Sequence, residues 1–392
     1  MNKQTVDIFF WVGEISGDRL ASKLIKKLKK KNPNIKIAGI TGPRMRELGV
    51  INLGNMERLN RWHLLLLFIS KPILYLLGYY VRWRALKLRP KVSIFVDAPT
   101  SSFMLAKHFK NAGYKGCYIK YVCPSFCWPD HGRRKRMESL FDVLISIVPN
   151  EKEMLKDANL SVHYIGHPIF EDRDIRQDNQ ILEVSNHSPR VTLFPGSRNW
   201  AVKRVLPAQL KSCKILAEKY PDMIIKISCA TQSLKRIIEK IVRKQKFEFR
   251  NLEIIKTYDE SSKNELMCQT DVAMAIPGTI NLELASFQIP TLLAFPIPGW
   301  FRWIGLSVWK MGNPQSKYSL INVVSEDKIY PELLETPFTP ENAAEILEDL
   351  LFNANLRSQI QQNCTSVCNI FKADTIDTDE AGIVMDYIQD WS

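Results

Sequence analysis

The chain has 392 residues, and its 54 Lys and Arg outnumber its 41 Asp and Glu, for a formal net charge of +13. That length makes a single domain unusual and comfortably fills two α/β domains with hydrophobic cores. The positive charge favours an anionic partner such as nucleic acid, a phosphorylated ligand or an acidic lipid surface. Nucleic acid is the weakest of these, because no recognised nucleic-acid-binding module is present and the basic residues cluster with apolar ones.

The cysteines and the first residues bear on the compartment. The eight cysteines have neither a disulfide nor a zinc pattern, which indicates a reduced, cytosolic protein. Residues 1–7 lead directly into an apolar strand without the basic region and cleavage site of a signal peptide, so we do not expect export.

The first strand, expected over 7–12, ends in Gly-Glu-Ile-Ser-Gly-Asp at 13–18 and is followed by a helix over 19–30. Small residues let a ligand approach the backbone amides, and the helix start is positive. A turn that only caps the helix remains an alternative. Because two acidic residues would repel a phosphate, we expect this loop to meet sugar hydroxyls or an acceptor, through Gly13, Glu14, Gly17 and Asp18.

The apolar run over 59–80 is interrupted near its middle by Lys71 and Pro72, whereas a membrane-spanning helix needs about 20 apolar residues. Cations and aromatic residues surround it, as in a helix that lies on an anionic bilayer. The expected membrane contacts are Trp62, Leu66, Phe68, Tyr79 and Trp83. A helical hairpin buried against the sheet is the alternative.

A third strand, over 91–96 after one at 35–40, delivers Asp97 at its carboxyl end. A carboxylate there is suited to take a proton from an acceptor hydroxyl as general base. Capping of the following turn is the structural alternative. Further elements of this half are expected as a helix over 102–112 and strands over 117–122, 143–147 and 162–165.

The polar stretch 171–189 is predicted to be an interdomain linker. The alternation of strands and helices then restarts, with strands over 191–194, 224–228, 252–255, 272–275 and 291–294. We therefore predict an α/β protein with two doubly wound, Rossmann-like domains that face a cleft, 1–170 and 190–340. Residues 341–392 are predicted to form helices that pack back across the junction.

Two loops of the second half suit a nucleotide diphosphate. Gly196, Ser197 and Arg198 end a buried strand, and the arginine can offset charge on a departing diphosphate, unless it pairs with a surface carboxylate. Gly278 and Thr279 open a helix whose amides can bind phosphate, with Glu283 one turn later for ribose hydroxyls. A simple N-cap by Thr279 is the alternative here.

A metal site has little support in the sequence. Asp172-Arg173-Asp174 resembles an Asp-x-Asp metal motif but falls in the polar linker rather than at a strand end. His163 and His167 are four residues apart, yet Gly166 and Pro168 break any helix that would put both on one face. We expect no metal and no cofactor, and a structural role for His167.

Several motifs together resemble the lipid-A-disaccharide synthase family. They occur in order over nearly the whole chain: Gly-Glu-x-Ser-Gly-Asp at 13–18, Gly-x-x-Gly-Pro-x-Met-x-x-x-Gly at 39–49, Asp-Ala-Pro at 97–99, Gly-His-Pro at 166–168, Pro-Gly-Ser-Arg at 195–198, Pro-Gly-Thr-x-x-Leu-Glu at 277–283, Asn322 and Pro-Glu-Leu at 331–333. The set is far more specific than any one member.

The resemblance implies an inverting, metal-independent glycosyltransferase of the GT-B fold. Such an enzyme joins UDP-2,3-diacylglucosamine to 2,3-diacylglucosamine 1-phosphate, releases UDP and forms the β-1,6-linked disaccharide of lipid A. It works at the inner face of the cytoplasmic membrane as a peripheral protein; the oligomeric state stays open. By motif position Asp97 is the base, Arg198 contacts the diphosphate, and Gly278, Thr279, Glu283 and Asn322 belong to the nucleotide side.

The chain departs from the family pattern near the expected sites. Thr100-Ser101-Ser102 stands where Asp-Phe-Asn usually follows Asp-Ala-Pro, and tryptophans are displaced within 125–129. Ala201 replaces an acidic residue, Pro277 a serine and Glu335 a glutamine. Two alternatives therefore stay open: a divergent GT-B enzyme with another nucleotide sugar or lipid acceptor, and a catalytically silent relative that binds lipid or a partner.

Overall fold

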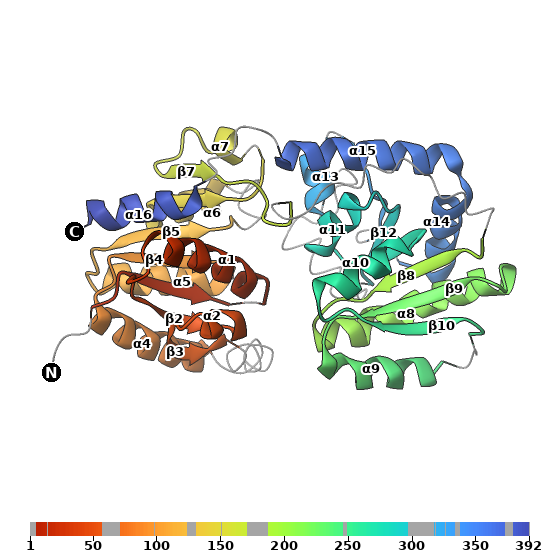
Figure 1. The fold of residues 1–392 in the computed structure, drawn as a ribbon, viewed down its shortest axis with the longest axis horizontal. Helices are drawn as coiled ribbons and strands as arrows, with labels where there is room; N and C mark the ends of the chain where they lie inside the picture. The colour runs from red at the N-terminus through yellow and green to blue at the C-terminus, as the bar shows by residue number, and fades with distance from the viewer. Residues whose placement is uncertain are drawn as a thin grey trace. The chain divides into compact units, whose positions relative to one another are not determined.

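The computed structural model describes residues 5–13, 15–56, 71–97, 99–123, 131–149, 151–170, 187–245, 249–296, 317, 319–325, 327–333, 338–372 and 379–391. The chain forms two compact units (Figure 1). Unit 1 comprises Met1–Pro168 and Lys372–Ser392, and unit 2 comprises Ile169–Phe371. The last helix of the chain thus belongs with the first half.

Unit 1 is built on a parallel sheet with the strand order β3-β2-β1-β4-β5-β6-β7 in the described part of the chain. The strands are β1 (Ile8–Val12), β2 (Ile37–Thr41), β3 (Ile51–Asn55), β4 (Val92–Val96), β5 (Cys117–Tyr121), β6 (Val143–Ser146) and β7 (Ser161–Tyr164). Successive strands are added on one side of β1 and then on the other. The carboxyl ends of β1 and β4 therefore form the switch point, where Rossmann-like sheets bind their ligands.

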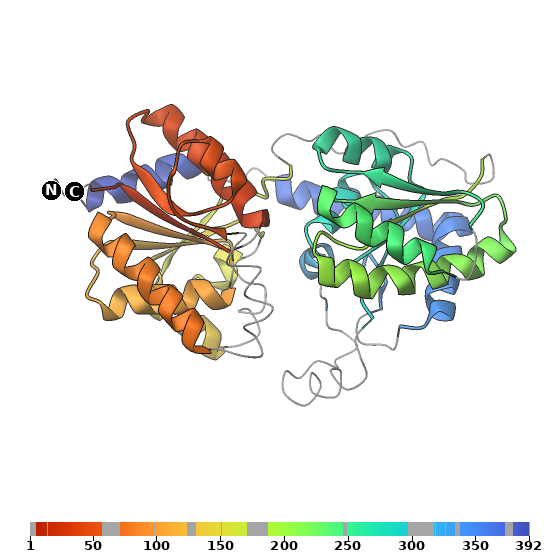
Figure 2. The same cartoon turned by 90° about the horizontal axis from the view of Figure 1, so that it is seen from below.

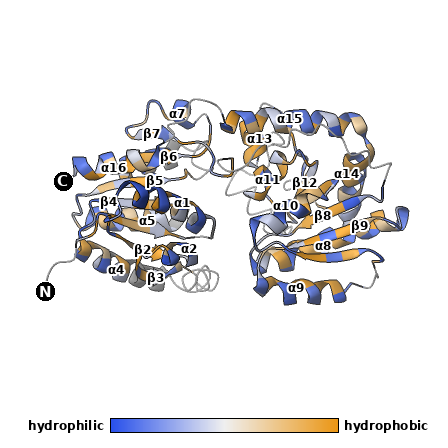
Figure 3. Cartoon of the chain, in the orientation of Figure 1, coloured by the Kyte–Doolittle hydropathy of each residue, from blue (hydrophilic) through white to orange (hydrophobic). Residues whose placement is uncertain are grey.

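Helices cover both faces of this sheet, with α1 on one face and α4 on the other (Figure 2). They are α1 (Ile15–Lys31), α2 (Pro43–Glu47), α4 (Lys71–Leu88), α5 (Pro99–Asn111), α6 (His131–Leu140), α7 (Glu151–Met154) and α16 (Glu380–Asp390). Because the sheet is covered on both sides, β1 and β4 are buried along their whole length and are almost entirely apolar. Helix α1 is amphipathic: Leu24 and Leu28 are buried, Lys26 and Lys30 are exposed, and the helix is largely hydrophilic in Figure 3.

Unit 2 repeats the same architecture with the order β10-β9-β8-β11-β12-β13. Its strands are β8 (Arg190–Phe194), β9 (Ile224–Cys229), β10 (Leu252–Lys256), β11 (Val272–Ala275), β12 (Thr291–Ala294) and β13 (Glu332–Leu333). Its helices are α8 (Asn199–Lys219), α9 (Gln232–Arg243), α10 (Glu260–Cys268), α11 (Ile280–Ser286), α13 (Leu320–Val324), α14 (Pro340–Phe352) and α15 (Ala354–Lys372). The switch point here lies at the carboxyl ends of β8 and β11.

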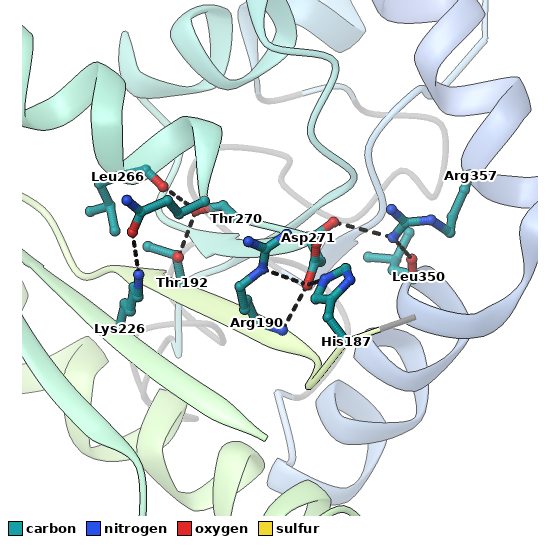
Figure 4. A network of polar contacts seen from close by, with 10 residues as sticks. His187, Arg190, Thr192, Lys226, Leu266, Thr270, Asp271, Leu350 and Arg357 are labelled. Carbon is teal, nitrogen blue, oxygen red and sulfur yellow. Dashed lines mark hydrogen bonds and ion pairs between the residues drawn. The ribbon is translucent and has the colours of Figure 1, made fainter. Parts of the chain in front are cut away.

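The amino ends of β8 and β11 are joined by a polar network around Asp271 (Figure 4). The buried Asp271 carboxylate accepts hydrogen bonds from the Arg190 guanidinium, Nη2 at 2.9 Å and Nε at 3.1 Å, from the Arg190 backbone N at 2.8 Å and from His187 at 2.9 Å. Arg357 of α15 donates to the Asp271 carbonyl at 3.2 Å and to Leu350 of α14 at 2.9 Å. The network lies at the edge opposite the switch point and fastens the last helices of unit 2 to its sheet.

All the strands expected from the sequence are present, with bounds that differ by at most two residues. The sequence analysis missed two edge strands, β3 and β13. β3 contains Asn52, Gly54 and Asn55, is only partly buried, and pairs with β2 through an irregular register. Its polar composition hides the alternation by which a strand is normally recognised.

Candidate functional site

The switch point of unit 1 brings together the two motifs expected to carry the acceptor chemistry. Ser16, in the first turn of α1, donates a hydrogen bond from Oγ to Asp97 Oδ2 at 3.3 Å. Asp97 follows β4 directly and is partly exposed, as is Gly13 at the end of β1. Glu14 lies outside the described residues. A carboxylate therefore stands at the carboxyl edge of the sheet, beside the glycine loop.

The Asp97 turn is held in an uncommon backbone conformation. Asp97 has a φ of +48°, in the left-handed region that non-glycine residues seldom adopt. Its backbone N donates to Tyr121 O at 3.0 Å, which extends the ladder to β5, and Ser102 Oγ donates to Asp97 O at 2.7 Å. Strained residues persist where their surroundings over-determine them, most often at functional sites.

Gly17 and Asp18 have packing roles in the structure. A Cβ on Gly17 would lie 3.2 Å from Val12 Cγ1 and 3.4 Å from Val96 Cγ1, so the glycine lets α1 approach β1 and β4 closely. The Asp18 side chain is buried and accepts hydrogen bonds from Arg44 N at 3.0 Å and Met45 N at 3.2 Å. We expected Asp18 to meet the acceptor; its carboxylate instead binds amides in the first turn of α2.

The Gly-His-Pro turn at the end of unit 1 is a buried element. His167 is almost completely buried; burial, together with the nearby positive charges of Arg19 and Lys23, lowers its pKa to about 3. Lys23 Nζ donates to Pro168 O at 2.8 Å. The imidazole is neutral at neutral pH, in keeping with the structural role expected of it.

At the switch point of unit 2, the loop after β8 contacts the loop after β11. Gly196 has a φ of +100°, and a Cβ there would lie 2.5 Å from Ile276 Cδ1, so only glycine fits. Ser197 and Arg198 are exposed, and Arg198 is the N-cap of the long helix α8 without a side-chain cap hydrogen bond. The first amides of α8 and a guanidinium thus lie together at this edge, an arrangement suited to an anion.

The loop after β11 is open around its glycine. A Cβ on Gly278 would have no atom within 4 Å, and Thr279 is exposed. Thr279 occupies the N-cap position of α11, but its side chain makes no cap hydrogen bond. Thr279 is therefore the N-cap by position, as the alternative expected, but it does not cap the helix through its side chain.

Glu283 and Asn322 were expected to contact the nucleotide, and both side chains are buried in other contacts. Glu283 Oε2 lies 2.5 Å from Lys263 Nζ of α10, with both side chains largely shielded from solvent. Asn322 is completely buried; its Oδ1 accepts from Ile329 N at 2.9 Å and Tyr330 N at 3.0 Å, and its Nδ2 donates to Tyr330 O at 2.8 Å. The Asn322 side chain thus ties α13 to the segment before β13 instead of facing a ligand.

Helix α4 carries an exposed aromatic surface on unit 1, which we call the α4 aromatic face: Tyr79, Tyr80 and Trp83. Tyr79 is 57% exposed and Trp83 is 50% exposed, and the Lys87 ammonium lies 3.4 Å from the centre of the Trp83 ring. The opposite side of the helix, with Val81 and Ala85, is buried. Trp62, Leu66 and Phe68 lie outside the described residues. Among the helices that the structure describes, none is long and apolar enough to cross a membrane.

Comparison with known proteins assigns the chain to a family. Residues 8–380 match the family described as lipid-A-disaccharide synthetase. The chain belongs to this family. Among its relatives, the lipid-A-disaccharide synthase of Chlamydia caviae is 32% identical over 351 residues, which cover 88% of this chain and 54% of that protein. The enzyme of the same name from Coxiella burnetii is 29% identical over 89% of both chains. This chain thus spans just over half the length of the Chlamydia caviae relative.

Solved structures share the fold at low sequence identity. A UDP-N-acetylglucosamine 2-epimerase from Listeria monocytogenes, named as putative in its description, has a TM-score of 0.60 at 11% identity, over 94% of both chains. MurG from Acinetobacter baumannii has a TM-score of 0.54 at 10% identity, over 98% of this chain and 99% of its own. Together with the two parallel sheets, these likenesses confirm the expected GT-B fold.

Two serines at the expected departure from the family pattern, residues 100–102, make hydrogen bonds in the structure. Ser101 Oγ accepts from Trp11 Nε1 at 3.2 Å, and Ser102 Oγ donates to the Asp97 carbonyl. Ala201, an expected departure in unit 2, is buried in the first turns of α8. Ser102 therefore supports the Asp97 turn.

Two residues that the sequence analysis did not single out contribute to these sites. Ser16 lies within the quoted 13–18 motif, so its position beside a strand end was the available signal. Lys263 has no such signal, because it precedes Glu283 by twenty residues and lies on another helix, so only the fold brings the two side chains together. The Asp-x-Asp stretch at 172–174, which was not expected to bind metal, lies outside the described residues.

Proposed function

We propose that this protein is an inverting, metal-independent glycosyltransferase that joins UDP-2,3-diacylglucosamine to 2,3-diacylglucosamine 1-phosphate. The products are the β-1,6-linked disaccharide 1-phosphate of lipid A and UDP. The observation that carries the proposal is the Asp97 carboxylate at the β1 and β4 switch point of a chain that matches the synthetase family over residues 8–380. Binding at this point is the general behaviour of open α/β sheets.

In the proposed reaction the Asp97 carboxylate is the general base. The 6-hydroxyl oxygen of the acceptor attacks the anomeric carbon of the donor, and its proton passes to Asp97. The bond from that carbon to the diphosphate oxygen breaks, and UDP leaves with the bonding electrons, which inverts the configuration. The hydrogen bond from Ser16 to Oδ2 orients the carboxylate and leaves Oδ1 to accept the proton.

Unit 2 is proposed to bind the UDP part of the donor. The exposed Arg198, the first amides of α8 and the open Gly278 loop supply positive charge and backbone donors suited to a diphosphate. These groups become more valuable as negative charge develops on the leaving group, so they serve the transition state as well as binding. Glu283 and Asn322 act here in buried contacts within unit 2, with Lys263 and with the segment before β13, rather than as ligand contacts.

The α4 aromatic face is proposed to hold the protein on the inner face of the cytoplasmic membrane. Both substrates are acylated and reside in that bilayer. Exposed Tyr79 and Trp83 beside Arg84 and Lys87 combine interfacial aromatic rings with cations that attract anionic lipid.

The test is UDP release by the purified protein given UDP-2,3-diacylglucosamine, with and without 2,3-diacylglucosamine 1-phosphate, in the presence of EDTA. The expected result is UDP release that depends on the acceptor, with a disaccharide product identified by mass. UDP binding without turnover would point to another acceptor. No UDP binding at all would contradict the proposal and favour a catalytically silent relative.

A further inference from the structure

Lys120 is a lysine in the interior of the unit 1 sheet. It lies on β5, next to β4, and is completely buried. A buried amine is costly unless its N–H groups reach acceptors. Lys120 Nζ donates to Asp97 O at 2.5 Å and to Phe95 O at 3.3 Å. Both acceptors are backbone carbonyls of the β4 end, so the amine is directed at the turn that carries the candidate base.

This turn requires support. Asp97 has a positive φ, and Val122, which directly follows β5, has a φ of +71°, a genuine outlier for a β-branched residue. Lys120 thus donates to one uncommon strand end and precedes the other by two residues, and both ends lie at the carboxyl edge of the sheet. The Asp97 carbonyl accepts from two side chains, Lys120 Nζ and Ser102 Oγ, and such convergence is what holds a residue in the left-handed region.

We propose that Lys120 is a positioning residue for Asp97. By holding the Asp97 carbonyl, its amine keeps the turn in the left-handed conformation and thereby directs the carboxylate toward the acceptor hydroxyl. Lys120 is buried, so it acts through Asp97 and does not touch substrate. The inference rests on the proposed function, in which Asp97 is the base.

The first variant is Lys120→Met, which keeps an unbranched side chain, one atom shorter, and removes its N–H donors. Lys226→Met is the matched control, because Lys226 is a buried lysine on a strand of unit 2 whose Nζ donates to Gln269 Oε1 at 2.5 Å. We expect Lys120→Met to lower kcat about 100-fold with both KM values within about twofold, since a small misplacement of a reacting group is that costly. The control should keep kcat within about twofold.

A crystal structure of Lys120→Met gives a readout that does not depend on activity. We expect Asp97 to leave the left-handed region while β4 and β5 stay in place. If the wild-type protein releases no UDP with the acceptor, the proposed function fails. The backbone conformation of Asp97 in the Lys120→Met crystal structure is then the measurement that tests the inference. An unchanged Asp97 turn would overturn it, whether or not kcat falls. A displaced turn with wild-type kcat would overturn it as well.

Lys120→Gln is the second variant, should Lys120→Met fail to fold. It shortens the donor by one atom and keeps an N–H group, so we expect a kcat loss of about tenfold and a smaller displacement of the same turn. Wild-type kcat together with a wild-type Asp97 conformation would contradict the proposal.

Discussion

Asp97 and Ser16 are 81 residues apart in sequence and meet because β1 and β4 are neighbours in the sheet. The close packing of Gly17 on both strands fixes the start of α1, which carries the Ser16 hydroxyl to the carboxylate. The geometry of one hydrogen bond thus depends on strand order and on the absence of a single Cβ. Substitutions at the site residues that leave packing unchanged can therefore test the proposed chemistry by itself.

Asp97→Asn tests the chemistry most directly. The amide keeps the size of the side chain and the ability to accept from Ser16, but it cannot take a proton. We expect kcat to fall about 10²- to 10⁴-fold while UDP affinity and thermal unfolding stay close to wild type. Steady-state UDP release and calorimetry of UDP binding measure the two effects. Asp157→Asn is the control, because Asp157 is exposed. Wild-type turnover in Asp97→Asn would contradict the assignment of Asp97 as the general base.

Arg198→Ala tests the anion-binding edge of unit 2. The guanidinium is exposed beside the first turn of α8, so its loss should leave folding intact. A charge-assisted hydrogen bond contributes about 1.5–3 kcal/mol, so we expect UDP to bind roughly 10- to 100-fold more weakly. Calorimetric titration with UDP is the measurement. Arg243→Ala, an exposed arginine of α9, should leave the affinity unchanged; equal losses in both variants would indicate a general charge effect.

Among the elements, α4 has two faces with different roles. Val81 and Ala85 pack into unit 1, whereas Tyr79, Tyr80 and Trp83 lie in solvent. The hairpin alternative concerned residues 59–80, of which 59–70 lie outside the described residues. On α4 the buried side packs on unit 1, and the exposed aromatic side is the one proposed to contact the membrane.

Replacing Tyr79 and Trp83 together with serine should therefore weaken association with vesicles that contain anionic lipid, without unfolding the protein. Interfacial aromatic rings lose their apolar contact when replaced, and about tenfold weaker partitioning is expected from the area removed. Vesicle co-sedimentation measures it, with Trp391→Ser as the control because Trp391 is 47% exposed at the end of α16. Equal partitioning of the double variant and the wild type would contradict a membrane role for α4.

The sequence predicted the apolar central strands well, because burial on both faces leaves them little compositional freedom. It also placed Asp97, Arg198 and Gly278 at strand ends, since motifs at the carboxyl edge follow directly from the strand pattern. Edge strand β3 escaped prediction because its polar residues face partly into solvent. The buried contacts of Asp18, Glu283 and Asn322 were not predicted, for a different reason. Each side chain binds a partner from another segment of the chain, and the local sequence does not indicate which segments meet.

At the scale of the whole molecule, the chain leaves unit 1 after Pro168 and returns to it for α16. Glu380, at the first position of α16, is 2% exposed and takes part in this return. Its Oε2 accepts from Tyr121 Oη of β5 at 2.7 Å, and its Oε1 lies 2.9 Å from Lys27 Nζ of α1. A single carboxylate therefore connects the end of the chain to a central strand and to the first helix.

Glu380→Ala should destabilise unit 1 by about 2 kcal/mol, because the buried Tyr121 hydroxyl loses this acceptor. Glu380→Gln should lose less, since its amide oxygen can still accept from Tyr121 and the pair with the half-exposed Lys27 is worth little. Glu153→Ala removes an exposed pair with Lys156 and should change stability by less than about 0.5 kcal/mol. Denaturant unfolding followed by tryptophan fluorescence measures all three. Equal stability of Glu380→Ala and Glu153→Ala would mean that α16 is held by its other contacts, the apolar ones and the pair of Asp379 with Lys31. The Glu380 carboxylate would then have no part in closing the chain onto unit 1.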